Sequence, residues 1–563
     1  MSLLQSSWQR ALLHAFGGSA LLLVPLLWGG LAAAQPAPGP AAKPQPGIDV
    51  QEYDFALALS DTTDRIEGTA TVRLRVTTDT LTAVRLDLIG RDGSHGAAPV
   101  SQTGMRVASV TSEGQEVSYR HDDDILRIVP PTGLTAGQSH TFRIEYAGVP
   151  ADGLIIGTNQ HGDRTFFGDN WPNRARHWLP VVDHLSDKAT VSFRVTAPAQ
   201  YKVVGNGALV QDSTSQGLRY THWHSDVPLP PKVMVIGVSD FAVDTAGTVD
   251  GVPVQSWVYP ENRRVGFRDL GQAPPILRFF EENLGPYPYE KLANVQSTTR
   301  YGGMENAAAI FYSEQAVADG EDSTPLLAHE IAHQWYGNTV TEADWPHLWL
   351  SEGVATYLTG LYLEHARGDA ALRRYMETAR EQVAQFHAQN PHTPLVDTTF
   401  SDPNELLNTN PYQKGAWVLH MLRQQVGTGT FWEGLRAYYD RYRNGNASTR
   451  DFRAVMEDVS GEDLKAFFAQ WTRRPGHPVI EGTWRHDAAA GECVVSLRQT
   501  QEEAPFRGPV EIAIDDASGT TTRMISMEGR RTQARVPCPQ APSAVTLDPN
   551  TRLLAEWSMR RAE

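Results

Sequence analysis

The sequence has few cysteines, no dense block of basic residues and no internal repeat. Its 49 lysines and arginines are outnumbered by 65 aspartates and glutamates, which gives the 563-residue chain a formal net charge of −16. Without a basic patch, nucleic acid is not an expected partner. The two cysteines, Cys493 and Cys538, both lie near the end of the chain. A lipid anchor on a cysteine near the predicted cleavage point is therefore not supported.

The first 34 residues are predicted to be a secretory signal rather than part of the fold. Arg10 precedes a long apolar run that includes Leu21 to Trp28, and the small residues Ala32 to Ala34 close it before Gln35. This order of basic, apolar and small residues is typical of an exported protein whose signal is cleaved. The alternative is an uncleaved membrane anchor, because the run is nearly long enough to span a bilayer. Glycine, serine and proline interrupt the run and favour cleavage, so we expect a periplasmic or secreted protein without stable membrane insertion.

Residues 35–47 read QPAPGPAAKPQPG, a stretch that is too rich in proline to pack. We interpret it as a semi-rigid linker. In an exported protein, the pair Cys493 and Cys538 favours a disulfide over a metal site, and two free buried thiols are the alternative.

Three patterns of hydrophobicity divide the rest of the chain, which has 41% hydrophobic and 20% charged residues. Residues 48–259 alternate with a period of two, as in Val72 to Val76, and predict a large N-terminal antiparallel β domain. Residues 260–474 shift towards a period of about 3.6, as in Val418 to Val426, and predict a mainly α region. Alternation returns in residues 475–563, which predict a small C-terminal β domain. The expected fold class is α+β with several domains.

Two histidines and a glutamate fall within the stretch HEIAH, His329 to His333. On a helix, His329 and His333 lie one turn apart on the same side and can both bind one metal ion. Glu330 is rotated about the helix axis, so it can face a water on the metal without binding the metal itself. The alternative for this motif alone is two solvent-facing histidines beside an ordinary glutamate.

Glu352 completes the ligand set that such a site needs. Catalytic zinc takes three protein ligands and keeps one position open. Glu352 stands near the start of a predicted second helix, Trp349 to His365, far enough along the chain for that helix to return antiparallel to the first. Two histidines and a glutamate form the ligand set of zinc peptidases such as thermolysin. The spacing therefore predicts one Zn²⁺ per chain, held by His329, His333 and Glu352.

Three motifs together resemble the zinc aminopeptidase family that includes aminopeptidase N and the leukotriene hydrolases. They are HEIAHQWYGN followed by LWLSEG, YGGMENAAAIFY from Tyr301 to Tyr312, and YQKGAWVLHML from Tyr412 to Leu422. The motifs occur in the family's order, and the succession of β, helical and β regions extends the resemblance over nearly the whole chain. The resemblance implies a thermolysin-like catalytic domain at residues 260–474 and a small β-sandwich at residues 475–563. Many members continue into a helical domain that covers the active site; we expect none here, and hence a more open cleft that tolerates longer peptides.

The resemblance also implies how the reaction proceeds. The zinc would make its bound water acidic, and Glu330 would take the proton of that water and pass it to the leaving amine. Tyr412, in the YxKG context, would donate its hydroxyl to the oxyanion that attack creates.

A carboxylate that meets the free α-amino group would make the enzyme an aminopeptidase, and Glu305 in GGMEN is the candidate. An ammonium paired with a fixed carboxylate places the scissile bond one residue from the end of the peptide. The preceding residues would let the substrate approach the backbone and pair with it as an added strand. These residues are Gly302, Gly303 and Met304.

The sequence departs from the family in residues that support the site. Many members hold the amino terminus with a glutamine or glutamate a few residues before an Ala-Arg pair, here Ala175-Arg176. The nearest acidic residue at that place is Asp169, which is shorter than glutamate and would give a tighter or shifted amine site. His347 and Ser351 stand where the family often has aspartate and asparagine. His347 could orient a metal ligand, but a packed polar residue is the simpler interpretation.

Two alternatives share some of these features. A thermolysin-type endopeptidase would use the same metal chemistry but would not need Glu305 to read a free amine. A catalytically silent scaffold with structural zinc is less consistent with the sequence, because structural zinc normally has four protein ligands and no general base. Epoxide hydrolysis, as in the leukotriene branch, has no support outside GGMEN. The sequence does not indicate the preferred N-terminal residue, the physiological substrate or the oligomeric state.

Overall fold

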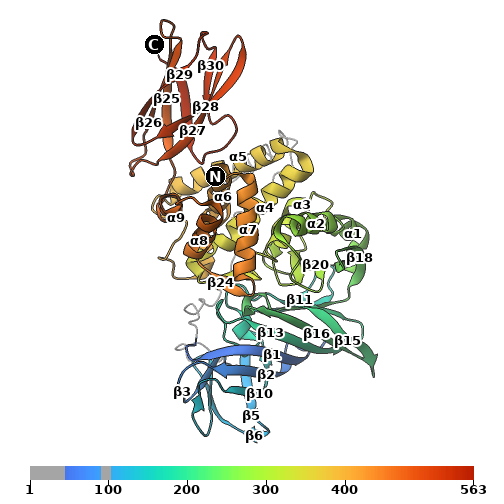
Figure 1. Cartoon of the computed structure of the whole chain (residues 1–563). Helices are drawn as coiled ribbons and strands as arrows, with labels where there is room; N and C mark the ends of the chain where they lie inside the picture. Colours follow the sequence, from blue (N-terminus) through green and yellow to red (C-terminus); the bar gives the residue numbers. More distant parts are fainter. Residues whose placement is uncertain (1–44, 91–102, 563) are drawn as a thin grey trace, which may run out of the picture.

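The structure is a computed structural model that describes residues 45–90 and 103–562. Three regions follow one another along an elongated molecule, with β-sheets at both ends and helices between them (Figure 1). The predicted signal segment and most of the predicted linker lie outside the described residues. Within the described ranges, no helix has both the length and the apolar character needed to cross a membrane.

An eight-stranded sheet forms the body of the N-terminal region. Its strands, in spatial order, are β15 (Ala208–Ser215), β16 (Leu218–Leu229), β13 (Ala189–Pro198), β1 (Ile48–Ala58), β2 (Ile66–Val76), β10 (Ser139–Val149), β5 (Gly104–Ser112) and β6 (Gln115–Glu116). The predicted alternation is confirmed in β2, where Val72, Leu74 and Val76 are buried and the two arginines between them are exposed. The pairing of β1 with β13 is parallel, so the sheet is not antiparallel throughout as predicted. A long connection rather than a hairpin separates these two strands, and this permits the parallel pairing.

Smaller sheets complete the N-terminal region. One contains β11 (Leu154–Thr158), β12 (Arg164–Gly168), β17 (Ile236–Ser239) and β14 (Lys202–Gly205), and β12 leads directly into Asp169. Two further sheets pair β4 (Val84–Asp87) with β8 (Ile125–Val129) and β7 (Ser118–Asp122), and β3 (Thr80–Leu81) with β9 (Leu134–Thr135).

A five-stranded sheet crosses the predicted boundary between residues 259 and 260. Its order is β18 (Ala242–Val249), β19 (Val252–Val258), β20 (Leu292–Ser297), β22 (Ala309–Ser313) and β21 (Gly303–Met304). Strand β19 pairs in parallel with β20, and the helices α1 (Arg263–Leu270) and α2 (Ala273–Leu284) lie between them in the chain. Strands β18 and β19, which precede residue 259, thus share a sheet with β21. Strand β21 is the edge strand of this sheet and carries part of GGMEN. Pattern alone does not reveal this, because the period of two is the same in either sheet.

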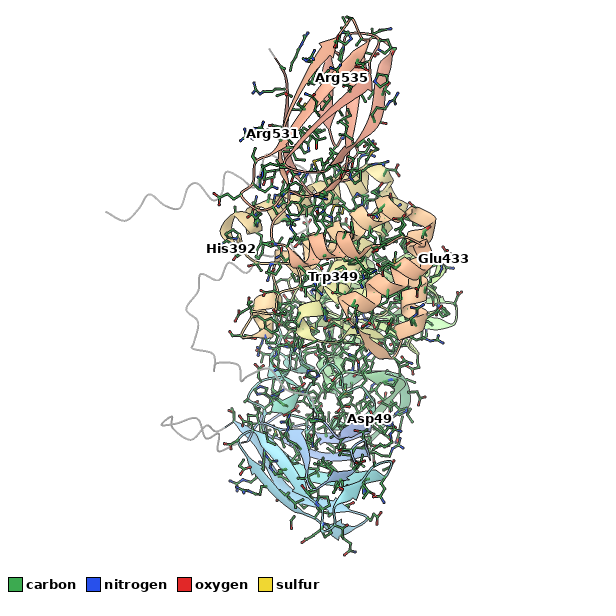
Figure 2. The ribbon with its side chains drawn as sticks, turned by 60° about the vertical axis from the view of Figure 1, so that its left-hand side comes forward. Asp49, Trp349, His392, Glu433, Arg531 and Arg535 are labelled. Atoms are coloured by element: carbon green, nitrogen blue, oxygen red, sulfur yellow. The ribbon has the colours of Figure 1, made fainter. Side chains whose placement is uncertain are left out.

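Helices fill the middle of the molecule. They are α3 (Thr324–Ala332), α4 (Trp349–Arg367), α5 (Asp369–Gln389), α6 (Gly415–Val426), α7 (Thr428–Tyr442), α8 (Thr449–Ser460) and α9 (Lys465–Arg473). The central helix is α4, in which every residue from Trp349 to Leu363 is buried. Figure 2 shows Trp349 among the helices of this region. The predicted helical period is confirmed in α6, where Val418, Met421 and Leu422 are buried. Buried α4 gives the metal-binding helix α3 a rigid surface to pack against.

The C-terminal region is built from two sheets. One has the order β29 (Arg531–Pro537), β26 (Glu492–Gln499), β25 (Val479–Asp487) and β31 (Glu556–Arg561). The other has the order β28 (Gly519–Met527), β27 (Gly508–Asp516) and β30 (Ala544–Leu547). Side chains from both sheets, including Val495 and Ile512, are buried, as expected of a small β domain with a core of its own.

Cys493 and Cys538 are free, buried thiols in the structure, and the predicted disulfide is absent from it. Cys493 lies in β26 opposite Val536 of β29, and the backbone N–H of Cys538 donates to the carbonyl of Gly491 at 2.8 Å. Cys538 directly follows β29, two positions beyond Val536, so the two cysteines are diagonal neighbours across this pair of strands.

Candidate active site

The HEIAH motif lies at the C-terminal end of α3, as the spacing predicts. Pro325 occupies the first turn of this helix, where its missing N–H costs nothing. Residues Leu327, Ala328 and Ile331 are fully buried and fix the helix against its neighbours. The helix ends at Ala332, and His333 is its capping residue with helical backbone angles.

Three ligand atoms converge at this point. The Nε2 atom of His329 lies 3.0 Å from Nε2 of His333, and each of these nitrogens lies 3.3 Å from Oε2 of Glu352. Ligand atoms at zinc distances of about 2.0–2.1 Å in a tetrahedron are separated by about 3.3 Å. Among the described residues, this is the group of three such side chains whose donor atoms gather closely enough for a metal. The donor set and its spacing therefore fit Zn²⁺.

The electrostatics of the cluster favour a positive charge between these side chains. Burial opposes the charged form of Glu352, but His333 and His329 lower the pKa of this carboxyl below its ordinary value. Burial likewise opposes protonation of His333, yet the carboxylates of Glu352, Glu305 and Glu330 raise its pKa to about 10. Several carboxylates in a buried site thus attract a cation.

Glu330 lies against the GGMEN segment. A Cβ atom built on Gly303 would come within 2.2 Å of Oε1 of Glu330, so glycine is required for the strand to pass this close. A Cβ on Gly302 would meet no atom within 4 Å, so close packing does not explain the glycine at this position. Burial raises the pKa of Glu330 well above its ordinary value, and the neighbouring carboxylate of Glu305 adds to the shift. Such a carboxylate is a stronger base than an exposed one.

The backbone of Glu305 is tied to the chain just after HEIAH. Its carbonyl accepts hydrogen bonds from Nε2 of Gln334 at 3.0 Å and from Nδ2 of Asn338 at 2.6 Å. Oε1 of Gln334 accepts from the backbone N–H of Ala308 at 2.9 Å. Met304, the residue before Glu305, is buried and pairs with Phe311 of β22. The residues QWYGN thus clamp GGMEN to the metal-binding helix.

The carboxylate of Glu305 is left available by this clamp. Glu305 is 5% exposed, and its Oε1 atom is buried without a hydrogen-bond partner among the described residues. Burial raises its pKa, while the positive charges of His333 and Lys232 oppose the shift. Lys232 is itself buried and forms an ion pair with Glu342 at 2.7 Å. A buried carboxylate oxygen without a donor is a ready acceptor for an ammonium group.

Tyr412 faces the same cluster from another element. It lies in a single π-helical turn, η6 (Asn410–Lys414), that runs into α6, and such turns are frequent at functional sites. Its half-buried ring stacks on that of His329, with centroids 6.0 Å apart and an interplanar angle of 15°. Burial raises the pKa of Tyr412 well above its ordinary value, and the carboxylates of Glu352, Glu305 and Glu330 add to the shift. The phenol therefore stays protonated and can donate a hydrogen bond.

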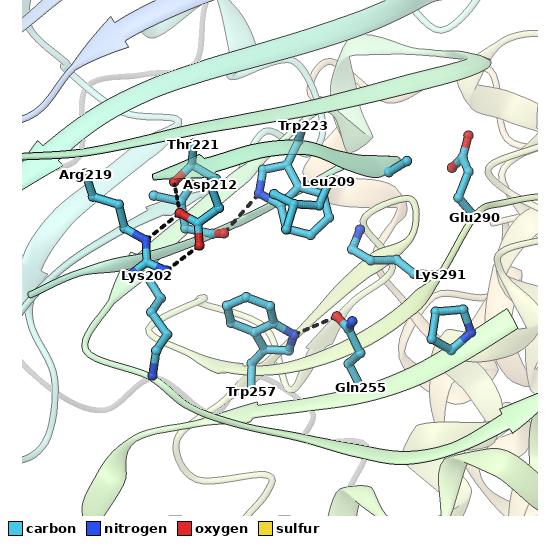
Figure 3. Close-up of a pocket in the computed structure, with 13 residues that line it drawn as sticks. Lys202, Leu209, Asp212, Arg219, Thr221, Trp223, Gln255, Trp257, Glu290 and Lys291 are labelled. Atoms are coloured by element: carbon cyan, nitrogen blue, oxygen red, sulfur yellow. Dashed lines mark hydrogen bonds and ion pairs between the residues drawn. The ribbon is translucent and has the colours of Figure 1, made fainter. Parts of the chain in front are cut away.

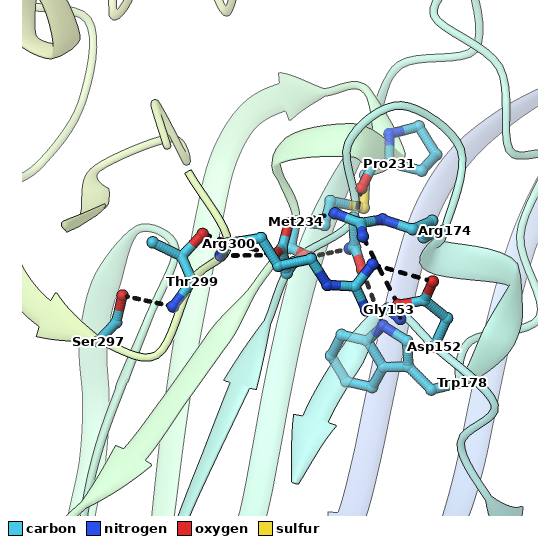
Figure 4. A network of polar contacts seen from close by, with 11 residues as sticks. Asp152, Gly153, Arg174, Trp178, Pro231, Met234, Ser297, Thr299 and Arg300 are labelled. Atoms are coloured by element: carbon cyan, nitrogen blue, oxygen red, sulfur yellow. Dashed lines mark hydrogen bonds and ion pairs between the residues drawn. The ribbon is translucent and has the colours of Figure 1, made fainter. Parts of the chain in front are cut away.

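Asp169 lies in a buried network with Arg174, Thr299 and Arg300. Figure 4 shows these three partners. Asp169 is wholly buried, and Arg174 donates to its Oδ1 at 2.5 Å. Its Oδ2 accepts from the backbone N–H of Arg300 at 3.3 Å and from the hydroxyl of Thr299 at 3.4 Å. The side chain of Arg300 in turn pairs with Asp152. Both oxygens of Asp169 are thus engaged, Oδ1 by Arg174 and Oδ2 by the segment that precedes Tyr301.

Other supporting residues were not singled out by the sequence reasoning. Gln334, Asn338 and Lys232 could not be found, because their partners are remote in the chain or are backbone groups. The side chain of His347 contacts the hydroxyl of Thr449 at 3.0 Å, so the packed interpretation fits its surroundings.

A separate cavity of about 260 Å³ is lined by residues of β14, β15, β16 and β19 and by the residues just before β20 (Figure 3). Two indole rings, Trp223 and Trp257, line it together with Gln255, Glu290 and Lys291. It contains none of the predicted site residues.

Comparison with known proteins adds an independent line of evidence. Two family models match the sequence: the Peptidase M1 N-terminal domain over residues 50–231 and the Peptidase family M1 domain over residues 268–471. The second range contains every predicted zinc ligand, Glu305, Glu330 and Tyr412.

Curated relatives are similar over part of their length. Aminopeptidase M1-A of Oryza sativa subsp. japonica is 29% identical over 325 residues, which cover 55% of this chain and 37% of that protein. Glutamyl aminopeptidase of Homo sapiens is 28% identical over 329 residues, which cover 55% and 34%. Aminopeptidase M1 of Arabidopsis thaliana is 26% identical over 455 residues, which cover 76% and 50%. The chain thus spans between about a third and a half of the length of these relatives.

Solved structures of an M1 zinc metallopeptidase from Deinococcus radiodurans share the fold. A glutamate-to-alanine mutant of that enzyme has a TM-score of 0.63 and 26% identity, and the match covers 77% of this chain and 96% of that chain. The same mutant bound to the substrate Tyr-Ser-Ala has a TM-score of 0.63 and 25% identity, with 76% and 95% covered.

Proposed function

This chain belongs to peptidase family M1, and on that premise we propose that it is a zinc-dependent aminopeptidase that releases N-terminal residues from peptides. The observation that carries the proposal is the buried carboxylate of Glu305, one oxygen of which has no hydrogen-bond partner in residues 45–90 and 103–562. It shares its surroundings with the three converging side chains His329, His333 and Glu352. An endopeptidase would need the ligands but not this carboxylate.

His329, His333 and Glu352 would hold the zinc ion. When bound, Zn²⁺ supplies a Lewis acid that polarises the scissile carbonyl and makes a water acidic near neutral pH. Glu330 is the general base that accepts the proton of the attacking water and later delivers it to the leaving amine. Burial raises its pKa above the ordinary value of a carboxyl group, which favours acceptance of the proton.

The hydroxyl of Tyr412 donates a hydrogen bond to the carbonyl oxygen of the scissile bond as negative charge develops there. A raised pKa keeps the phenol protonated for this role. The stacked ring of His329 fixes the direction of the phenol, so little reorganisation is needed during the reaction.

Glu305 binds the α-ammonium group of the substrate. Strand β21, which contains Gly303 and Met304, stands at the edge of the five-stranded sheet and offers its backbone to an incoming peptide strand. Gly302, at the open approach to this edge, leaves room for the first residue of the peptide. Such pairing places the first peptide bond, rather than an internal one, beside Glu330.

Asp169 serves this site as a positioning residue in our proposal. Since its two oxygens are engaged by Arg174, Arg300 and Thr299, it supports the segment before GGMEN rather than meeting the amine. This role differs from the direct amine contact expected by analogy with the glutamine or glutamate of other family members.

We further infer that the protein is exported and works on peptides outside the cytoplasm. The basic, apolar and small-residue order of residues 1–34 supports this inference. In such an oxidising compartment, the adjacent thiols of Cys493 and Cys538 can be joined. N-terminal sequencing of the secreted chain would test export, with a start at or near Gln35 expected.

A matched pair of peptides, one with a free amino terminus and one N-acetylated, tests the activity. The zinc-loaded mature chain should cleave the free peptide one residue at a time, leave the acetylated one intact, and lose activity when a chelator removes the metal. Glu305→Gln should lower kcat/KM for the free peptide by about 10- to 100-fold, because a charge-assisted hydrogen bond is lost. Glu433→Gln, an exposed change in α7, is the matched control.

Other outcomes would redirect the assignment. Equal internal cleavage of both peptides would indicate a thermolysin-type endopeptidase. Cleavage of neither, over varied sequences and with one zinc bound per chain, would favour a scaffold.

A further inference from the structure

We propose that Ser351 is a positioning residue that holds the zinc ligand His333 in its binding orientation. The proposal rests on the zinc site described above and adds a residue that stands where the family often has asparagine. It also gives a physical reason for Gly337 in the WYGN part of the first motif.

The contacts of the His333 ring carry the argument. Its Nε2 atom faces His329 and Glu352, and its Nδ1 atom lies 3.1 Å from Oγ of Ser351 and 3.1 Å from the carbonyl oxygen of Tyr336. A neutral imidazole that offers the lone pair of Nε2 to a metal carries its hydrogen on Nδ1. That N–H then donates to the two oxygen atoms. The carbonyl of Tyr336 can only accept and so selects this tautomer, and the two contacts together fix the plane of the ring.

The arrangement is deeply buried. Ser351 and His333 are each 1% exposed, so water does not compete for Nδ1. Serine is neutral, and its hydroxyl fixes the ring without adding a negative charge to a site that already contains three carboxylates. An aspartate at the same place would add a fourth charge next to Glu352.

The packing of α3 against α4 brings His333 and Ser351 together. His333 caps α3 and Ser351 lies in the first turn of α4, so their contact depends on how these helices pack. Gly337 lies between them with φ of +122°, and a Cβ atom there would come within 2.4 Å of Oγ of Ser351 and 2.9 Å of Nδ1 of His333. Any side chain at this position would push the hydroxyl and the imidazole apart.

The test is the zinc affinity of the purified chain, measured by competition with a chromogenic zinc chelator. Ser351→Ala should weaken zinc binding by about 10- to 100-fold, the usual cost of losing a partner of a metal-ligating histidine. Thr356→Ala is the matched control, because Thr356 is also buried in α4 and its hydroxyl has no hydrogen-bond partner among the described residues. This control should bind zinc like the wild type.

A second variant keeps the test independent of the missing hydroxyl. Gly337→Ala retains Ser351 but forces a methyl group against its Oγ, so it should weaken zinc binding in the same direction. Circular dichroism of the metal-free variants checks that each chain is folded. Wild-type zinc affinity in folded Ser351→Ala would overturn the proposal while leaving the aminopeptidase assignment intact. Failure of the wild type itself to bind zinc would instead overturn the proposed function.

Discussion

The stacked contact between Tyr412 and His329 leads to a prediction about one hydroxyl group. Tyr412→Phe keeps the ring and removes the donor, so transition-state stabilisation should fall while the metal and the substrate still bind. We expect kcat to drop by about 10²- to 10³-fold with a KM within a fewfold of the wild type. Steady-state kinetics with a free-amine peptide measure both constants, and Tyr442→Phe in α7 serves as the control. An unchanged kcat would remove Tyr412 from the mechanism.

At the same scale, local spacing explains what could be predicted about the site. His329 and His333 could be predicted because two residues four positions apart lie one helical turn from each other. The structure brings both side chains to Glu352. The surroundings of Asp169 could not be read in this way, because nothing in the sequence shows that Arg174 and the backbone of Arg300 engage both of its oxygens.

The contact of Ser351 with His333 was missed for a related reason. Sequence reasoning noticed Ser351 as a departure from the family but considered only His347 as a group that could orient a ligand. The relevant distance depends on the packing of α3 against α4 and on the backbone angles of Gly337, which no periodicity encodes.

At the scale of elements, Gln334 joins the chain just after α3 to the segment that contains Glu305 and Ala308. Gln334→Leu keeps the volume but removes the donor to Glu305 and the acceptor for Ala308. We expect kcat/KM for free-amine peptides to fall about 10-fold and the free energy of unfolding to fall by about 1–3 kcal/mol. Kinetics with the free and acetylated peptides and thermal unfolding measure the two effects.

A matched control for this change exists on another helix. Gln425 is exposed on α6 and bonds to Glu462, so Gln425→Leu should alter neither quantity appreciably. A Gln334→Leu enzyme with wild-type kinetics would show that Asn338 alone suffices to hold the Glu305 carbonyl.

Strands β26 and β29 give a prediction about redox chemistry. With oxidised glutathione as the oxidant, Cys493 and Cys538 should lose two protons and two electrons and form one intramolecular disulfide, as two molecules of glutathione are released. The reaction should be slow, because burial raises the pKa of the Cys493 thiol to about 11 and little reactive thiolate is present. Mass spectrometry would detect the loss of two hydrogens. Persistent free thiols, or glutathione bound to either cysteine, would contradict the prediction.

The elements themselves were largely predictable, and their partners were not. Alternation in β2 and the helical period in α6 follow from local burial, and the structure confirms both. The parallel pairing of β1 with β13 and the transfer of β18 and β19 to the sheet of β20 are choices between equally patterned strands. Such choices are made by long-range packing, which period alone does not specify.

At the scale of the whole molecule, buried lysines join the N-terminal and helical regions. Nζ of Lys188 donates to the carbonyls of Asn338, Thr339 and Gly445 at 2.8 to 3.0 Å. Nζ of Lys291, just before β20, donates to the carbonyls of Gly205 and Gly207 in the N-terminal region. Because each of these lysines lies in one region and bonds to carbonyls of another, the relative placement of the regions is coupled to the protonation of the two lysines.

Lys291 allows the coupling to be measured. It is 3% exposed, donates to the carbonyls of Gly205 and Gly207 at 2.7 and 2.9 Å, and lies 4.4 Å from the centre of the Trp223 ring (Figure 3). Burial lowers the pKa of Lys291 from 10.5 to about 7, with Glu290 opposing the shift. Between these two pH values, the unfolded chain binds a proton that the folded chain does not. Stability should therefore rise with pH from about 7 to about 10, and this contribution should be lost below pH 7.

The test compares the thermal unfolding midpoints of the wild type and of Lys291→Met from pH 6 to pH 10 at constant ionic strength. The difference between the two proteins isolates Lys291 from other groups that titrate in the same range. The wild type should gain stability relative to the variant as pH rises through the window. Lys465→Met, which removes an exposed lysine in α9, should follow the wild-type slope. Equal slopes in the wild type and Lys291→Met would mean that the two carbonyls and the Trp223 ring hold the ammonium charged despite its burial, and the regions would then be joined independently of pH in this range.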